Sequence, residues 1–187
     1  VRRKYRPATT DSKHSQPVAE NLLQHDFTVA EPDRVWVSDS THIATERGWL
    51  YLTVFLDLFS RMVVGWALSS SLSALYANRR PGAGLIIHSD RGVQYASEAF
   101  RGVLKENHFV QSMSRKGNCW DNAVAESFFG ILKSELVHHE RFTGHQDTLR
   151  ALFEYIEIDY NRKRKHSTLG YQTPAQFEQA MKSAVCF

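Results

Sequence analysis

Three apolar segments that follow one another closely between residues 35 and 68 restrict the fold of this chain more than any other feature. The first begins at Val35, and the others cover residues 49–58 and 62–68, with Gly48 and Ser60 among the residues between them. Short apolar runs bounded by turn residues are typical of strands, and short connections join antiparallel neighbours. The sequence therefore predicts a three-stranded antiparallel meander.

Strands and helices alternate after the meander. The pattern predicts strands at 85–88 and 109–113 and helices at 97–107, 123–137 and about 147–164. The last helix should bury a stripe made of Leu149, Leu152, Phe153, Ile156 and Tyr160. Three antiparallel strands followed by two that alternate with helices predict an α/β fold, a ribonuclease-H-like mixed five-stranded sheet flanked by helices. Trp36, Trp49 and Trp66 are expected in its core.

The ends of the chain and one connection differ from this core. Residues 1–34 are polar and basic, which predicts an N-terminal arm or linker with at most one short helix near Val18 to His25. The core is expected at 35–140 and a helical extension with a basic segment at 141–187. Only 16 residues, Ser69 to Gly84, connect the third and fourth strands, so this connection has room for a shortened helix at about 74–80.

Composition limits the classes of function. Of 187 residues, 23 are Lys or Arg and 20 are Asp or Glu, giving a net charge of +3. Eight of the basic residues lie in two clusters, within residues 2–6 and 162–165, which leaves 15 basic against 20 acidic residues elsewhere. Such clusters attract phosphate backbones, so a nucleic-acid partner is one reading and a solvated surface is the other.

Other classes are excluded or disfavoured. The longest mainly apolar run, residues 49–56, is too short to cross a bilayer, and no export signal is visible at the N-terminus, so a cytoplasmic location and no membrane partner are expected. The two cysteines, Cys119 and Cys186, are too few for a disulfide framework or a four-thiolate zinc site.

Three acidic residues occupy positions where apolar residues would stabilise the fold better. Asp39 interrupts the first strand, Asp90 follows the fourth, and Glu126 lies in a helix that otherwise presents a broad apolar surface. Carboxylates that leave water need a cation, and oxygen ligands suit Mg²⁺ or Mn²⁺. Two such ions, roughly 3.5–4 Å apart, serve displacement reactions at phosphorus. Asp57 also follows an apolar strand, but its position favours a hydrogen-bonded turn.

Polar neighbours accompany these acids. Asn122, Glu126 and Lys133 are spaced to share one helix face, which could face phosphates or simply solvent. His88 precedes Asp90 by two residues and could tune its ionisation, although a hydrogen-bonded structural histidine is the favoured reading.

Several motifs closely resemble the second-reading-frame protein of the insertion-sequence-three family of bacterial transposases. They are Trp36–Asp39, Gly48–Leu52, Ser60–Trp66, His88–Gly92, Ser112–Asn118, Asp121–Phe128, and the ending Tyr160–Arg162, His166–Ser167, Leu169–Tyr171 and Thr173–Pro174. The resemblance implies an integrase-type Asp-Asp-Glu triad with 35 residues between the second Asp and the Glu, and 35 residues do separate Asp90 from Glu126. A basic residue seven positions after the Glu is also implied, and Lys133 matches it.

The resemblance implies a polynucleotidyl transferase that cleaves and joins DNA at insertion-sequence ends, using Mg²⁺ or Mn²⁺. Asp39, Asp90 and Glu126 would be both catalytic and metal-binding. DNA would be bound by Lys133, Arg115, Lys116, Asn118, Asn122, Arg162 and Arg164. For residues 162–165 the alternative is that they complement the dipole of a helix end, and for 115–118 that they cap the following helix. The implied partners are DNA, further copies of the chain, and an upstream-frame helix-turn-helix protein joined through frameshifting.

One departure from the family leaves two alternatives open. The connection of residues 69–84 is shorter than the family's, and it would cover less of one sheet face. The chain could therefore be a catalytically inactive DNA-binding remnant. The other alternative is a ribonuclease-H-like nuclease that cuts DNA without joining it.

Overall fold

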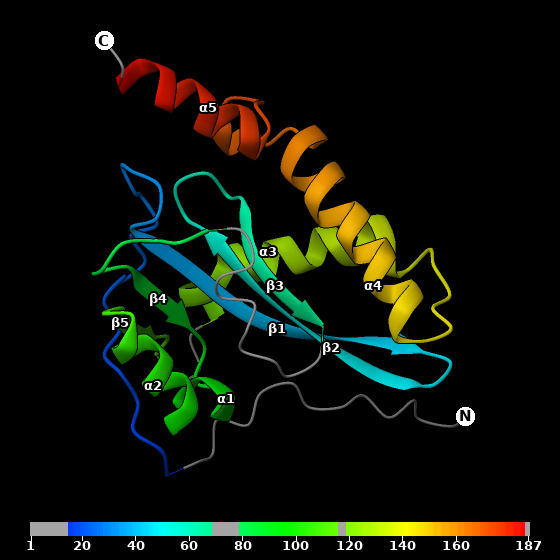
Figure 1. The fold of residues 1–187 in the computed structure, drawn as a ribbon, viewed down its shortest axis with the longest axis horizontal. Coiled ribbons are helices and arrows are strands. Elements are labelled where there is room, and N and C mark those ends of the chain that lie inside the picture. The colour runs from blue at the N-terminus through cyan, green and yellow to red at the C-terminus, as the bar shows by residue number, and fades with distance from the viewer. Residues whose placement is uncertain (1–14, 69–78, 116–118, 186–187) are drawn as a thin grey trace.

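A computed structural model describes residues 15–68, 79–115 and 119–185, with side chains described for all of these except 119, 120, 184 and 185. Its centre is a five-stranded sheet in the order β3-β2-β1-β4-β5 (Figure 1). The strands are β1 (Val35–Thr45), β2 (Gly48–Asp57), β3 (Val63–Leu68), β4 (Ile86–Ser89) and β5 (Val110–Met113). The meander pairs are antiparallel, whereas β4 runs parallel to both β1 and β5. This confirms the predicted ribonuclease-H-like mixed sheet.

Strand register brings two predicted site residues to neighbouring positions. In the parallel pairing of β1 with β4, Ser38 lies opposite Ser89, and these are the last paired residues. Asp39 and Asp90 each follow directly in their chains. Because parallel strands advance in step, both acids lie at the same end of this ladder.

Helices cover both faces of the sheet. α1 (Val93–Ala96) and α2 (Glu98–Glu106) pack on the face that carries Trp36, Phe55 and Ile87. The other face, which carries Val37, Val54 and Leu56, is covered by α3 (Ala123–Leu132), α4 (His145–Phe153) and the helical segment η4 (Glu154–Lys163). Successive side chains of a strand alternate between faces, so each strand supplies both hydrophobic clusters.

The predicted helix at 97–107 is confirmed as α2. The hydroxyl of Ser97 accepts the N–H of Phe100 at 3.2 Å, which is the N-cap expected from the sequence. The predicted helix at 123–137 is also present, as α3 followed by a π-helical turn, η3 (Lys133–Val137).

The last predicted helix exists, but one residue of its buried stripe is wrong. α4 and η4 run without a break from residue 145 to residue 163. Phe153 is 56% exposed, and Tyr155 is buried instead. From Glu154 onward the helix is π-wound, which widens each turn and rotates the inward side toward Tyr155 and Ile156.

The N-terminal helix predicted near Val18 to His25 is absent. The amide N–H of Leu22 donates to the Ser112 hydroxyl at 3.0 Å, and the carbonyl of Glu20 accepts the N–H of Met113 at 3.2 Å. Backbone groups of this segment therefore bond to β5 rather than to one another. Gln24 and His25 have positive φ angles of 47° and 69°, which belong to a turn.

Residues 15–34 and 141–185 both pack on the sheet. Leu23 is buried in the same hydrophobic cluster as Val37, and so are Phe142, Leu152 and Ile156. The division at residues 34 and 140 stays a prediction, and in the structure one cluster extends across both boundaries. Among the described residues no helix is long and apolar enough to span a membrane.

Two elements at the C-terminal end were not predicted. These are a short 3₁₀ turn, η5 (Ser167–Leu169), and α5 (Pro174–Val185). α5 lies beyond the end of η4, away from α2 in Figure 1. Phe177 of α5 packs against Phe59 with ring centroids 5.0 Å apart, so α5 touches the turn between β2 and β3.

Most of the predicted helix at 74–80 lies outside the described residues, since these omit 69–78. Residues 79–85 are described and form no helix. Trp49, expected in the core, is 39% exposed because it lies at the hairpin end of β2, where its ring packs against His42 with ring centroids 4.9 Å apart. Trp36 is fully buried, as predicted.

Candidate active site

Asp39 lies in the middle of β1 on the face that α3 covers. It shares this face with Val37 and Ile43, which belong to the cluster containing Phe128 and Leu132 of α3. Its carboxylate accepts the backbone N–H of Ser40 at 2.7 Å, and the residue is half-buried. Sequence alone places an acid in this strand, and the packing of α3 on β1 determines what that acid faces.

Asp90 begins the loop that follows β4. Its Oδ1 accepts the backbone N–H of Gly92 at 2.8 Å, and the carbonyl of Gly92 then accepts the N–H of Tyr95 in α1. The loop is therefore fixed at both ends, by the β4 ladder and by α1.

Glu126 and Lys133 come from α3 and the first residue of η3. Ala125, Phe128 and Leu132 are buried against the sheet, whereas Glu126 is exposed and Lys133 is half-buried. The apolar side of α3 is thus fixed against β1, and its acidic residue lies at the margin of that contact.

The charges of these residues act on one another. The pKa of Asp39 is raised to about 7, mainly by burial and next by the negative charge of Asp90. Glu126 also raises the pKa of Asp39, while the hydrogen bond from Ser40 and the positive charge of Lys133 lower it. Electrostatic effects of this kind act over short distances, so β1, the β4 loop and α3 bring three carboxyl groups and one ammonium group together.

The donor chemistry of this cluster fits a hard divalent cation. Three carboxyl groups supply only oxygen ligands, and a cation between them would offset the repulsion that opposes ionisation of Asp39. In the described part of the chain, however, no group of three His, Cys, Asp or Glu side chains is already arranged around one ion position.

His88 is a structural histidine, as the favoured reading proposed. It is fully buried, and its ring nitrogens lie 2.8 Å from the Ser112 hydroxyl and 3.3 Å from the Ser114 hydroxyl. Burial lowers its pKa to about 4, so it is neutral at pH 7. Ser112 lies in β5 and Ser114 follows β5 directly. The two contacts therefore join β4 to β5 just before Asp90.

The predicted DNA-binding loop is only partly described, because Lys116 and Asn118 lie outside the described residues. Arg115 is exposed, and its guanidinium pairs with Asp121 at 3.1 Å. Asn122 is 5% exposed, and its side-chain oxygen has no hydrogen-bond partner. In this conformation Asn122 is therefore not presented to a ligand on the surface.

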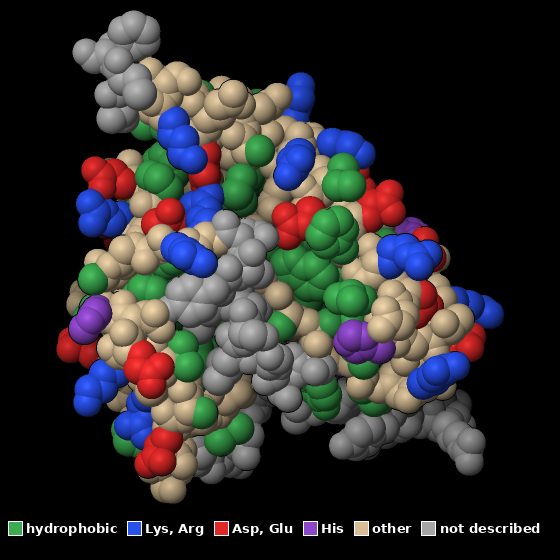
Figure 2. Space-filling model, viewed as in Figure 1, with side chains coloured by type: hydrophobic (Ala, Val, Ile, Leu, Met, Phe, Trp, Pro, Cys, Tyr) green, Lys and Arg blue, Asp and Glu red, His purple; other side chains and the backbone are tan. Residues whose placement is uncertain are grey.

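The basic segment at the end of η4 is partly exposed and partly packed against the fold. Arg162 is exposed, and Lys163 pairs with Asp159 one helical turn earlier at 2.7 Å. Arg164 is half-buried and pairs with Glu135 at 3.0 Å. On the described part of the face in Figure 2, Lys and Arg side chains alternate with Asp and Glu rather than forming one continuous patch.

Sequence reasoning missed a buried ionic cluster around Arg79. This side chain pairs with Asp33 at 2.9 Å, with Asp57 at 3.0 Å, and with Glu178 of α5. Asp57 also accepts the N–H groups of Asp33 and Phe59, both at 2.8 Å. The predicted hydrogen-bonding role of Asp57 is thus confirmed, but its partner Arg79 is 22 residues away and has no local signal.

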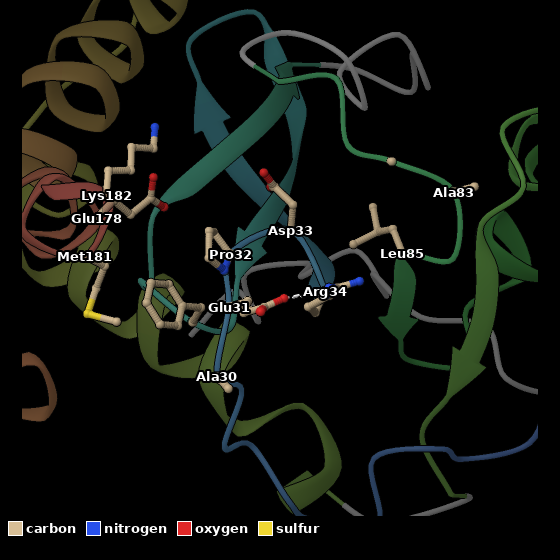
Figure 3. Close-up of a pocket in the computed structure, with 12 residues that line it drawn as sticks. Ala30, Glu31, Pro32, Asp33, Arg34, Ala83, Leu85, Glu178, Met181 and Lys182 are labelled. Atoms are coloured by element: carbon tan, nitrogen blue, oxygen red, sulfur yellow. Dashed lines mark hydrogen bonds and ion pairs between the residues drawn. The ribbon is translucent and has the colours of Figure 1, made fainter. Parts of the chain in front are cut away.

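A groove of about 580 Å³ adjoins this cluster (Figure 3). Glu178, Met181 and Lys182 of α5 form one side, and residues 30–34 and Leu85 form the other. It lies where the chain enters β1 and β4, whereas Asp39 and Asp90 follow the paired parts of those strands. The groove is therefore separate from the acidic cluster.

The sheet order and the helices on both faces define the class of protein: an integrase-like catalytic core. Two models described as "Integrase core domain" match residues 29–119 and 126–181. Among solved structures, a chain of the simian T-cell lymphotropic virus intasome matches with a TM-score of 0.65 at 21% identity, covering 91% of this chain and 61% of that chain. The HTLV-2 integrase catalytic core in complex with magnesium matches with a TM-score of 0.57 at 20% identity, covering 79% and 97%.

Sequence relatives identify the family. The chain is 45% identical over 187 residues to the 31 kDa protein of insertion element IS600 from Shigella sonnei, covering 95% of this chain and 68% of that protein. It is 43% identical over 186 residues to transposase InsF of insertion sequence IS3A from Escherichia coli K12, covering 94% and 64%. The chain belongs to the insertion-sequence-three family of transposases, as its motifs predicted, and spans about two thirds of the length of these relatives.

Proposed function

We propose that this chain is the catalytic domain of a DNA transposase, which cleaves phosphodiester bonds at insertion-sequence ends and joins the ends to target DNA. The observation that carries the proposal is the electrostatic coupling of Asp39 with Asp90, Glu126 and Lys133. Perturbed acids that act on one another at one place in a fold are typical of catalytic sites. Family membership gives these acids a reaction, and the matched integrase cores give them a fold.

In this proposal Asp39, Asp90 and Glu126 hold divalent Mg²⁺ or Mn²⁺, two ions in the active complex. Such ions activate an attacking oxygen and stabilise the leaving one in displacement at phosphorus. The chain's own contribution is to keep three carboxyl groups on rigid elements and to lower the water content around Asp39, whose pKa of about 7 reflects its burial. Lys133, on the same side of α3, supplies a positive charge toward the phosphates of the reacting strand.

The proposed partners are DNA and further copies of the chain. Arg115 and Arg162 have exposed side chains that can reach a phosphate backbone. The matched simian viral chain belongs to an intasome, and this favours assembly of several copies on DNA ends. An upstream-frame helix-turn-helix protein, joined by frameshifting, and a location in the cytoplasm on the nucleoid complete the proposal.

The test compares the wild-type chain with Asp90→Asn and with Asp159→Asn as a surface control. A duplex that carries the insertion-sequence end is incubated with Mg²⁺, and cleavage and joining to a second duplex are measured on gels. Asp90→Asn should abolish both reactions and leave DNA binding largely intact, because the carboxamide preserves shape but removes the charge. Asp159→Asn should behave as wild type, since the Asp159 side chain is exposed and pairs with Lys163 on the surface.

The same assay separates the alternatives. Cleavage without joining, even when a 3′-hydroxyl end is supplied, would identify a nuclease. DNA binding without Mg²⁺-dependent cleavage by the wild-type chain would identify an inactive remnant. Undiminished cleavage by Asp90→Asn would refute the assignment of the site.

A further inference from the structure

Asp121 has the most completely satisfied carboxylate near the candidate site. Its side chain has no exposed surface. One oxygen accepts the backbone N–H of Arg115 at 2.7 Å and the Arg115 Nε–H at 3.2 Å, and the other accepts the Arg115 Nη2 at 3.1 Å. The ring nitrogen Nε2 of His25 lies 2.5 Å from the same second oxygen. Charge-assisted bonds of this number fix a side chain firmly.

The position of Asp121 gives these bonds a structural consequence. Asp121 lies in the 3₁₀ turn η2 (Cys119–Asn122), which continues directly into α3. Arg115 follows β5 by two residues. The contact therefore closes the connection between β5 and α3 across its two ends, five residues before Glu126.

The contact also continues toward Asp90. The carbonyl of Ser114 accepts the Nε–H of Arg91 at 2.7 Å. The backbone N–H of Ser114 donates to the carbonyl of Ser89 at 2.9 Å. Ser89 and Arg91, the residues on either side of Asp90, thus both bond to the backbone of Ser114. The next residue in the chain is Arg115, which bonds to Asp121. One line of contacts runs from the loop of Asp90 through Arg115 and Asp121 to the beginning of the Glu126 helix.

The N-terminal segment joins this line through His25. Its backbone is already attached to β5, through Leu22 with Ser112 and through Glu20 with Met113. The N-terminal segment and the connection between β5 and α3, about 90 residues apart in sequence, therefore meet at one carboxylate. Asp121→Asn would remove the negative charge that faces the Arg115 guanidinium and the His25 ring, and it would replace one acceptor oxygen with an N–H donor, which is costly at a buried position.

We propose that Asp121 is a positioning residue, which holds the beginning of α3, and with it Glu126, in register with Asp90. The proposal rests on the proposed function, because register between these two acids matters only if they act together. It assigns Arg115 a role besides DNA contact. Half of the Arg115 side chain is exposed, and a guanidinium has five N–H donors, so Arg115 can hold Asp121 and still face a phosphate.

The chain offers a matched control in Asp147. This carboxylate likewise accepts several N–H groups, those of Thr143, Gly144 and Thr148, at 2.6–3.0 Å. Its pKa is lowered to about 2, as is the pKa of Asp121. It caps α4, however, and the groups that donate to its side chain belong to residues 143, 144 and 148, next to the beginning of that helix. Asp147→Asn therefore reports the general effect of losing such a carboxylate.

The first experiment measures Mn²⁺ binding to the full chain with an end duplex present, by electron paramagnetic resonance of the free ion. Asp121→Asn should weaken Mn²⁺ binding about tenfold or more, as is typical for residues that orient metal ligands. The Mn²⁺ affinity of Asp147→Asn should stay within about twofold of wild type, although its unfolding temperature should fall about as much as that of Asp121→Asn. Arg115→Met should match Asp121→Asn, and the double variant should be no worse than either single one.

The second experiment is limited trypsin digestion, which does not depend on metal or activity. Cleavage after Arg115 should be faster in Asp121→Asn than in wild type and unchanged in Asp147→Asn. Equal Mn²⁺ affinities and equal digestion rates for the two variants would overturn the positioning role while leaving the transposase proposal in place. Absence of any Mn²⁺ binding by the wild-type chain with DNA would overturn both.

Discussion

Protonation of His88 should destabilise the folded chain below pH 6.5. Burial lowers the pKa of His88 from 6.5 to about 4, and a hydrogen bond to the backbone of Asp121 together with the Asp121 charge offsets only part of this effect. A group whose pKa is lower in the folded state binds protons more readily when unfolded. Its stabilising contribution is therefore complete above the unfolded pKa and is lost as the pH falls toward the folded one.

The magnitude follows from the two pKa values. Between pH 7 and pH 5 the free energy of unfolding should fall by about 1.8 kcal/mol through His88 alone. Asp57 acts in the opposite direction, because burial raises its pKa to about 6, so its ionisation weakens the fold as the pH rises. A difference between variants isolates His88 from such groups.

Urea unfolding of wild type and His88→Gln at pH 7 and pH 5 makes the comparison, with His145→Gln as an exposed control. Gln cannot take up a proton. Between pH 7 and pH 5 the free energy of unfolding of the variant should therefore fall by about 1.8 kcal/mol less than that of wild type, although the variant is less stable at pH 7. The control should follow wild type. A His88→Gln curve that declines in parallel with wild type within about 0.5 kcal/mol would show that the buried site accepts the charge, contrary to this reasoning.

Two further predictions concern the support of the sheet. Asn161 pairs its side-chain oxygen and nitrogen with the N–H and C=O of Val63, both at 3.0 Å, and so completes the edge strand β3. Asn161→Ala should lower the free energy of unfolding by about 2–3 kcal/mol in urea titrations, and an unchanged midpoint would contradict this account. Phe128 is 1% exposed and meets Tyr160 edge-on at 4.8 Å, whereas Phe153 is 56% exposed. Phe128→Ala should lower the free energy of unfolding by about 3–5 kcal/mol, and Phe153→Ala should lower it by less than about 0.5 kcal/mol. Similar losses for both variants would be inconsistent with the observed packing.

Local patterns predicted most of the sheet and the major helices, because their causes are local. Gly48 and Ser60, the residues between the apolar runs, lie at real strand boundaries: β2 begins at Gly48, and Ser60 lies between β2 and β3. Ser97 caps α2, as its spacing to Phe100 suggested. α5 was also open to prediction. The Thr173 hydroxyl accepts the N–H of Gln176, and the Gln176 side chain accepts the N–H of Thr173, both at 3.1 Å. Thr, Pro and Gln in this order are a capping box with proline at the first helical position.

The errors come from partners that are distant in sequence. Residues 18–25 have no strong conflict with a helix, yet their backbone groups bond to Ser112 and Met113, about 90 residues away. The ion pairs of Arg79 with Asp33 and Glu178 depend in the same way on where the sheet brings the chain. A single sequence contains no signal for such contacts, because they follow from the completed fold.

Asp39 and Asp57 show why position in the sequence could not by itself identify the candidate site. Both acids occur in or at the end of an apolar strand, and burial raises the pKa of each, to about 7 and about 6. Their neighbours differ in kind. Asp57 is surrounded by donors, two backbone N–H groups and the Arg79 guanidinium, so its carboxylate is satisfied within the fold. Asp39 has one backbone donor, while Asp90 and Glu126 oppose its ionisation. A cation would stabilise an acid that the fold buries beside other acids, and for this reason Asp39, rather than Asp57, is the acid that we propose as a site residue.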